Sequence, residues 1–150
     1  MTQPLDIDAL RARFLNQVFD EKTFTFDANA LAEYARACGE QSPRYTDTAH
    51  PDFQAPPTFP TSLHAGKRLP DGFPRFEGLG MDAGKAVSPI APIRPNVQHV
   101  GRTHLHDIYT KTGRSGRMVF MVIRMEIFDP KETLVATADT SIVIRERPTA

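Results

Sequence analysis

Arg117-Met-Val-Phe-Met-Val-Ile-Arg-Met-Glu-Ile-Phe128 is the stretch of sequence that decides the fold. Its odd-numbered positions from 119 to 127 are all apolar, which is the two-residue alternation of a β-strand. Met118, Phe120 and Val122 make the beginning of the opposite face apolar as well. A strand that is apolar on both faces is expected to be covered on both. One cover is expected to be a helix of this chain, and the other either its loops or a partner subunit.

Similar strand patterns stand on both sides of this stretch. Residues 99–110 precede it across Thr112-Gly-Arg-Ser-Gly116, and residues 133–146 follow it across Asp129-Pro-Lys-Glu132. Both connectors are rich in the residues that favour hairpin turns. With a fourth segment at 85–93, the pattern predicts a run of antiparallel strands in the second half of the chain.

The beginning of the chain has the signals of a helix and a short strand. A helix is predicted over residues 5–19, with Asp6 as its N-cap. Its apolar stripe recurs at helical spacing and consists of Ile7, Leu10, Phe14 and Val18. The alternating residues 22–26 then predict a short strand.

A second helix is predicted over residues 28–38. Asp27 is its expected N-cap, and Gly39 stands where a helix ends. Cys38, the only cysteine, falls on the apolar stripe of this helix and is expected to be a buried structural thiol.

Prolines punctuate residues 40–74, but interleaved phenylalanines favour ordered loops over disorder. A short helix is possible at 58–66. Because helices come first and a run of strands follows, the fold class is predicted to be α+β. We expect one domain over residues 1–150, with residues 1–22 as an N-terminal helical extension.

Composition excludes several classes of function. The chain has 150 residues, 40% of them hydrophobic, and a formal net charge of zero. This balance gives no reason to expect a nucleic-acid or membrane partner, and it favours self-association. The first residues lack the apolar core of a secretory signal, so a cytoplasmic location is expected.

One motif and several shorter blocks carry a family resemblance. Tyr34-Ala-Arg-Ala-Cys-Gly-Glu-Gln-Ser-Pro-Arg-Tyr-Thr-Asp47 resembles the hydratase signature of MaoC-like proteins, in which a helix ends in Gly-Asp-x-Asn-Pro-x-His. Further blocks look like the variant known as FAS1-like, or N-terminal MaoC, dehydratase domains. In chain order they are 55–59, 92–95, 107–120 and 134–136.

The resemblance implies a fold and a reaction. The fold is a hotdog, a curved antiparallel sheet wrapped around a helix, and two hotdogs pair along an acyl-thioester tunnel. The reaction is the reversible hydration of a trans-2-enoyl-CoA or enoyl-ACP to the (R)-3-hydroxyacyl thioester. The family uses no metal and no redox cofactor.

The catalytic positions of the motif differ in this chain. Glu40 stands at the position of the Asp, and Tyr45 at that of the His. Glutamate is a competent base but is one methylene longer, and an error of about 1 Å can cost ~100-fold in rate. A tyrosine hydroxyl does not readily give up its proton at neutral pH. Glu40 is thus either a base or a solvated carboxylate, and Tyr45 either touches substrate or packs.

Other residues are candidates for binding. The resemblance places Pro57, Thr58 and Phe59 at the substrate. Arg114 and Arg117 either meet CoA phosphates by their charge or are solvated surface residues. The histidines of the strand region suggest a metal site, but no carboxylate or cysteine has convincing ligand spacing, so none is predicted. They are His99, His104 and His106.

Three functions remain open at this point. The first is an acyl-thioester-binding subunit of an (R)-specific hydratase, paired with a catalytic MaoC-like hotdog that supplies Asp and His. The second is a self-sufficient homodimeric hydratase with Glu40 as its base. The third is a non-enzymatic acyl-CoA-binding or scaffold module.

Overall fold

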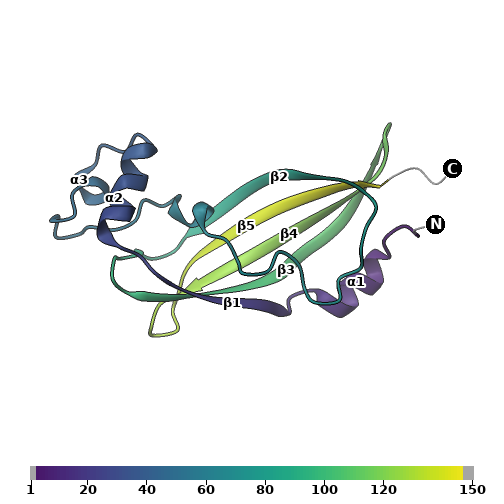
Figure 1. Ribbon diagram of the computed structural model, residues 1–150, viewed down its shortest axis with the longest axis horizontal. Coiled ribbons are helices and arrows are strands. Elements are labelled where there is room, and N and C mark those ends of the chain that lie inside the picture. Colours follow the sequence, from purple (N-terminus) through teal and green to yellow (C-terminus); the bar gives the residue numbers. More distant parts are fainter. Residues whose placement is uncertain (1–2, 147–150) are drawn as a thin grey trace.

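A five-stranded antiparallel sheet forms the body of the molecule (Figure 1). The computed structural model describes residues 3–146. The strands lie in the order β1-β3-β4-β5-β2. Their bounds are Val18–Thr25 for β1, Gly78–Pro89 for β2, Gln98–Gly113 for β3, Gly116–Phe128 for β4 and Leu134–Glu146 for β5. The antiparallel sheet expected for a hotdog is confirmed, although β2 begins and ends before the predicted 85–93.

Tight hairpins join the three central strands, as predicted. Gly113 pairs with Gly116 across the first turn, where Gly116 has φ 101°, a conformation that suits glycine. In the second turn the Asp129 carboxylate accepts hydrogen bonds from the N–H groups of Lys131 and Thr133, each at 2.9 Å. These local contacts fix the register of β4 against both neighbours.

One face of the sheet carries the core. The odd-numbered residues of β4 from 119 to 127 are buried. Toward one end of the sheet they pack under α1 (Ile7–Phe14), and toward the other under α2 (Ala28–Ala37) and the short 3₁₀ helix η1 (Phe59–Ser62). The even-numbered residues of β4 are only half-buried, and no helix or loop of residues 3–146 forms a core with them. Loops of the described residues therefore do not cover the second face, and its cover by a partner subunit stays a prediction.

The first helix is shorter than predicted. Its N-cap is confirmed, since the Asp6 carboxylate accepts a hydrogen bond from Ala9 N–H at 3.0 Å. The helix ends at Phe14 because Asn16 adopts φ 59° and its N–H donates to Leu105 O. Val18, predicted on the buried stripe, instead begins β1 and is 55% exposed.

The second helix is confirmed with its caps. The Asp27 carboxylate accepts from Ala30 N–H at 3.2 Å, and Gly39 has φ 80° at the end. Leu31 and Ala35 are fully buried on its inner side. Cys38, however, is exposed, so the prediction of a buried thiol is wrong. Cys38 is the C-cap, where the chain turns away from the core.

The segment between α2 and β2 is ordered and mostly irregular. A one-turn helix, α3, covers Pro43–Thr46, and η1 is shorter than the predicted 58–66. After η1 the chain crosses the covered face, where the Asp20 carboxylate accepts the N–H groups of Gly66 and Lys67. Within residues 3–146 no helix is long and apolar enough to cross a bilayer.

Candidate functional site

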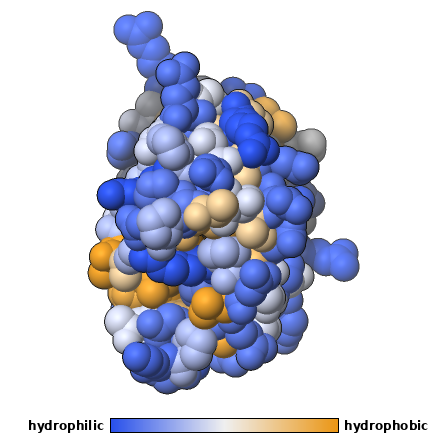
Figure 2. Space-filling model, turned by 90° about the vertical axis from the view of Figure 1, so that its left-hand side faces the viewer, coloured by the Kyte–Doolittle hydropathy of each residue, from blue (hydrophilic) through white to orange (hydrophobic). Residues whose placement is uncertain are grey.

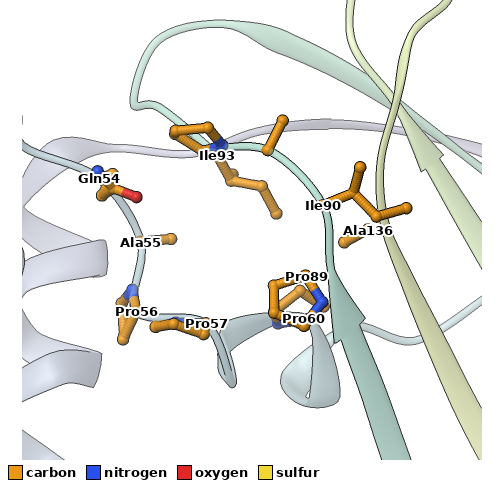
Figure 3. A pocket seen from close by; sticks show the side chains of 11 residues that line it. Gln54, Ala55, Pro56, Pro57, Pro60, Pro89, Ile90, Ile93 and Ala136 are labelled. Carbon is orange, nitrogen blue, oxygen red and sulfur yellow. The ribbon is translucent and has the colours of Figure 1, made fainter.

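A pocket of about 210 Å³ opens at the end of the sheet where β2 finishes (Figure 3). One wall is the segment after α3 together with η1, and the other is the chain that leaves β2. The lining residues are Gln54, Ala55, Pro56, Pro57, Pro60, Pro89, Ile90, Ala91, Pro92, Ile93 and Ala136. Gln54 is the only one with a polar side chain. The pocket therefore suits an apolar group and offers no charge to orient an ionic one.

Backbone geometry holds the two walls together. The N–H of Ala55 donates to Ile93 O at 2.8 Å, which ties the walls to each other. The N–H groups of Ile90 and Ala91 both reach Val135 O on β5. The prolines fix their φ angles and bring no N–H donors, so the lining is stiff and apolar. Ile90 is 58% exposed at the mouth.

Figure 2 looks onto the end of the molecule that carries α2 and α3. Hydrophobic residues appear there in separate patches among hydrophilic ones. An ion cluster braces this end. The Asp52 carboxylate meets Arg94 Nη2 at 2.7 Å and Arg44 Nε at 3.0 Å, and the hydrogen bond from Arg94 lowers the pKa of Asp52. Because Gln54 N–H donates to Arg44 O, this cluster also positions the pocket wall.

Glu40 and Tyr45 lie in the turn between α2 and α3. Both are half-buried. In the described part of the chain no hydrogen bond joins the Glu40 carboxylate to the Tyr45 hydroxyl or to any other group, whereas the turn itself is held by Arg36, which donates to Thr46 O at 2.8 Å. The two side chains thus share a turn without forming a hydrogen-bonded acid–base pair.

The start of η1 offers little to a developing oxyanion. Phe59 N–H donates to Pro56 O, Thr61 N–H donates to Thr58 O, and Pro60 has no N–H. Hydrolytic and hydration sites commonly use free backbone N–H groups for this purpose. At η1 these donors are occupied by the turn itself.

The predicted substrate residues differ in their surroundings. Pro57 lines the pocket, and Thr58 is exposed beside it. Phe59 is buried, with its ring edge-on to those of Phe26 and Tyr34 at 4.8 and 5.2 Å between centroids. Phe59 thus packs the core beneath the pocket.

Arg114 and Arg117 lie at the opposite end of the sheet from this pocket. Both belong to the hairpin between β3 and β4, and α2 lies at the other extremity in Figure 1. Arg117 binds Glu146 at 3.0 Å and donates to Leu5 O at 2.8 Å, so it fastens the N-terminal segment. The structure does not bring these arginines to the pocket of the same chain.

The three histidines all lie on β3. His99 is buried and its Nδ1 contacts Val97 O at 2.9 Å. His104 lies 3.3 Å from His106 and 3.6 Å from Glu126, and burial lowers the pKa of His104. Among residues 3–146 no group of three or more histidine, cysteine or acidic side chains is arranged to hold a metal.

Sequence reasoning missed Asp52 and Arg94 as positioning residues. They are 42 positions apart, and nothing in the local pattern links them. It also missed the second wall of the pocket, because the segment around Ile90 was expected to be strand. Only the folded chain shows that this segment faces Ala55.

Known proteins resemble this chain along most of its length. The family model "FAS1-like, dehydratase domain region" matches residues 13–138. Among curated proteins none matches. A MaoC-like dehydratase from Phytophthora capsici superposes on 97% of this chain with TM-score 0.74 and 20% sequence identity. This chain spans 52%, or about half, of the length of that protein.

Two relatives from Mycobacterium tuberculosis are complexes. The ChsH1-ChsH2 complex superposes with TM-score 0.64 at 15% identity, covering 96% of this chain and 90% of the other. The HadBC (3R-hydroxyacyl-ACP dehydratase) complex gives TM-score 0.59 at 16% identity, covering 86% and 99%. At these identities the likeness shows a shared fold.

Proposed function

Since the chain belongs to the family of FAS1-like dehydratase domains, we propose that it is the acyl-thioester-binding subunit of an (R)-specific enoyl-CoA or enoyl-ACP hydratase. A second, catalytic hotdog supplies the Asp and His that this chain lacks. The observation that carries the proposal is an apolar pocket in a chain whose motif positions hold Glu40 and Tyr45. The pocket wall is joined to the segment of Tyr45 by the hydrogen bond from Gln54 N–H to Arg44 O.

The pocket supports a role in holding the acyl chain. Apart from Gln54, its lining side chains offer an alkyl group apolar contacts, and burial of alkyl groups contributes roughly 0.8 kcal/mol for each CH₂. Pro57, singled out from the sequence, lies in the wall. The absence of charged side chains from the lining favours unsubstituted acyl tails over dicarboxylates.

The catalytic positions support a partner for the chemistry. Addition of water to an enoyl thioester needs a base that accepts a proton and an acid that returns one. Glu40 and Tyr45 share no hydrogen bond, and the N–H groups of Phe59 and Thr61 are already bonded. A partner with an intact Asp–His pair would provide the acid and the base.

The edge of the sheet supports pairing. β2 is an edge strand of 12 residues, and nearly all of them are exposed. A long exposed edge is a template for a strand of another chain. The ChsH1-ChsH2 and HadBC relatives are described as complexes, which supports a hotdog partner for this chain.

The proposal is tested by placing a charge at the mouth of the pocket. Ile90→Glu is expected to weaken binding of a medium-chain enoyl-CoA by about tenfold or more, because a carboxylate beside the alkyl chain must be desolvated. Isothermal titration of the full chain measures the affinity. Val18→Glu is the matched control, since Val18 is a similarly exposed aliphatic residue on β1, outside the pocket.

Equal binding by Ile90→Glu and the parent chain would contradict the placement of the acyl group. Undetectable binding by the parent chain, both alone and with a catalytic hotdog partner, would contradict the function itself. Retained binding by Val18→Glu excludes a general effect of added negative charge.

A further inference from the structure

The side of the sheet that faces away from the helices has an uneven composition. We call it the open face: the even-numbered residues of β4 from Met118 to Phe128 and their register neighbours on the adjoining strands. These β4 residues are half-buried. A solvated sheet face usually carries polar side chains.

Half of the open face is apolar and aromatic. Tyr109 and Phe120 stack with centroids 5.1 Å apart and planes within 3°. Leu79 and Met81 on β2 are 53% and 38% exposed. Met118 pairs with Arg145 on β5, which in turn pairs with Leu79 on β2. A patch that combines half-buried aromatic rings with exposed leucine and methionine side chains has the composition of the centre of a protein interface.

Cations lie around this apolar half, and the described residues give them no acidic partner. Lys111 Nζ lies 5.3 Å from the ring centroid of Phe120 and 5.7 Å from that of Tyr109. Arg145 is exposed and pairs with Met118, two positions before Phe120 on β4. Arg114 is exposed in the hairpin turn between β3 and β4. Within residues 3–146 none of these three cations makes an ion pair. This end of the open face is therefore positive.

The other end of the open face is negative. Arg124 binds Asp139 through two hydrogen bonds of 2.7 and 2.8 Å. Arg102 binds both Glu21 and Glu132, at 3.1 and 3.0 Å. With Glu126 added beside His104, the carboxylates at this end outnumber the guanidinium groups. A surface with the opposite arrangement of charges would meet both ends with electrostatic complementarity.

A second copy of this chain has that arrangement. We propose that two copies pack open face on open face about a two-fold axis between Phe120 and Val122. The positive end of each copy then lies over the negative end of the other, and the aromatic pairs lie near the centre. Self-complementarity of this kind is what a two-fold interface requires. The zero net charge of the chain agrees with it.

The size of the open face is sufficient. At ~3.3 Å per residue and ~4.8 Å between strands, five strands the length of β2 cover roughly 40 Å by 20 Å. This is close to the ~800 Å² that each partner buries in a standard interface. The open face presents side chains of β2 and its neighbours, whereas the β2 edge presents backbone groups, so a molecule that uses both interfaces becomes a dimer of dimers.

The test compares assembly masses by light scattering coupled to gel filtration. Lys111→Glu with Arg145→Glu is expected to halve the mass of the assembly. Arg68→Glu with Arg75→Glu, an equal charge change at exposed positions outside the open face, is expected to leave it unchanged. Mixing the first variant with Glu21→Lys/Glu132→Lys is expected to restore the parent mass, since the ends again carry opposite charges.

Two outcomes would overturn the proposal. One is a parent chain that stays monomeric at tens of micromolar, and the other is a Lys111→Glu/Arg145→Glu variant that keeps the parent mass. If that variant folds poorly, as judged by circular dichroism, recovery of mass on mixing still decides. Its enoyl-CoA affinity should equal that of the parent chain, so a failure here is distinguishable from a failure of the proposed function.

Discussion

Glu40 is the residue on which the choice between the proposed functions depends. It follows Gly39 directly, at the point where α2 ends and the chain turns toward α3. Its backbone N–H donates to Ala35 O at 2.9 Å, and this bond closes the helix end. The turn therefore fixes the backbone of Glu40, while its carboxylate keeps no partner among the described residues.

Glu40→Gln is expected to leave the hydratase activity of the paired complex nearly unchanged. The reason is that the partner supplies the acid and the base, whereas loss of a true general base costs ~10² to 10⁴ in rate. Steady-state hydration of crotonyl-CoA measures this, and removal of the partner's aspartate is the positive control. We expect the isolated chain to be slow or inactive. Robust turnover by the isolated chain, abolished in Glu40→Gln, would establish the self-sufficient enzyme instead.

His104 is expected to make stability depend on pH. Burial lowers its pKa below the ordinary 6.5, so near and below that pH the unfolded chain binds more protons than the folded one. The free energy of unfolding therefore rises with pH through this window, and the contribution of His104 is lost as the pH falls through it. Urea denaturation across a pH series should show a flatter profile for His104→Gln.

His64→Gln serves as the control for this measurement, because His64 is an exposed histidine in a loop. An identical pH profile in His104→Gln and the parent chain would show that His104 is not the residue responsible. Glu126 and His106 both face His104. Glu126 raises the pKa of His104, whereas His106 lowers it.

At the scale of elements, α2 is the support for the candidate site. On its buried side, Leu31 and Ala32 pack in one hydrophobic cluster with residues of β4, β5 and η1. These include Ile127, Val135 and Phe59. The helix thereby holds both the turn of Glu40 and the wall of the pocket against one end of the sheet.

Leu31→Ala is expected to reduce the free energy of unfolding by about 2–5 kcal/mol, because Leu31 is fully buried and the cavity cannot collapse completely. Glu33→Ala, on the exposed side of the same helix, should change it by less than about 0.5 kcal/mol. Chemical denaturation measures both. Equal effects of the two substitutions would mean that α2 does not pack as described.

At the scale of the whole molecule, the exposed β2 edge should become protected when the catalytic partner binds. The outward N–H groups of an edge strand lack partners, and a paired strand supplies them. Hydrogen exchange of residues 78–89 is therefore expected to slow in the complex, while that of the 113–116 hairpin stays the same. Unchanged exchange along β2 in a stable complex would place the partner elsewhere.

Local patterns predicted much of the fold. The alternation around Val119 to Ile127, the two hairpin turns, the caps Asp6 and Asp27 and the helix end at Gly39 all depend on residues within a few positions of one another. Such preferences act before distant parts of the chain meet, so the sequence by itself determined the three central strands, their turns and the family. It also singled out Pro57, which lines the pocket, whereas the roles of Pro57, Glu40 and Tyr45 stay predictions.

The tertiary structure decided what depends on long-range packing. The first helix stops at Phe14 because Asn16 bonds to Leu105 on a strand some ninety positions later in the chain. The pocket exists because Ala55 meets Ile93, and Arg114 lies far from it because β3 and β4 extend the full length of the sheet. A periodic pattern states which side of a strand is apolar, but only the arrangement of all elements decides which side this chain covers itself.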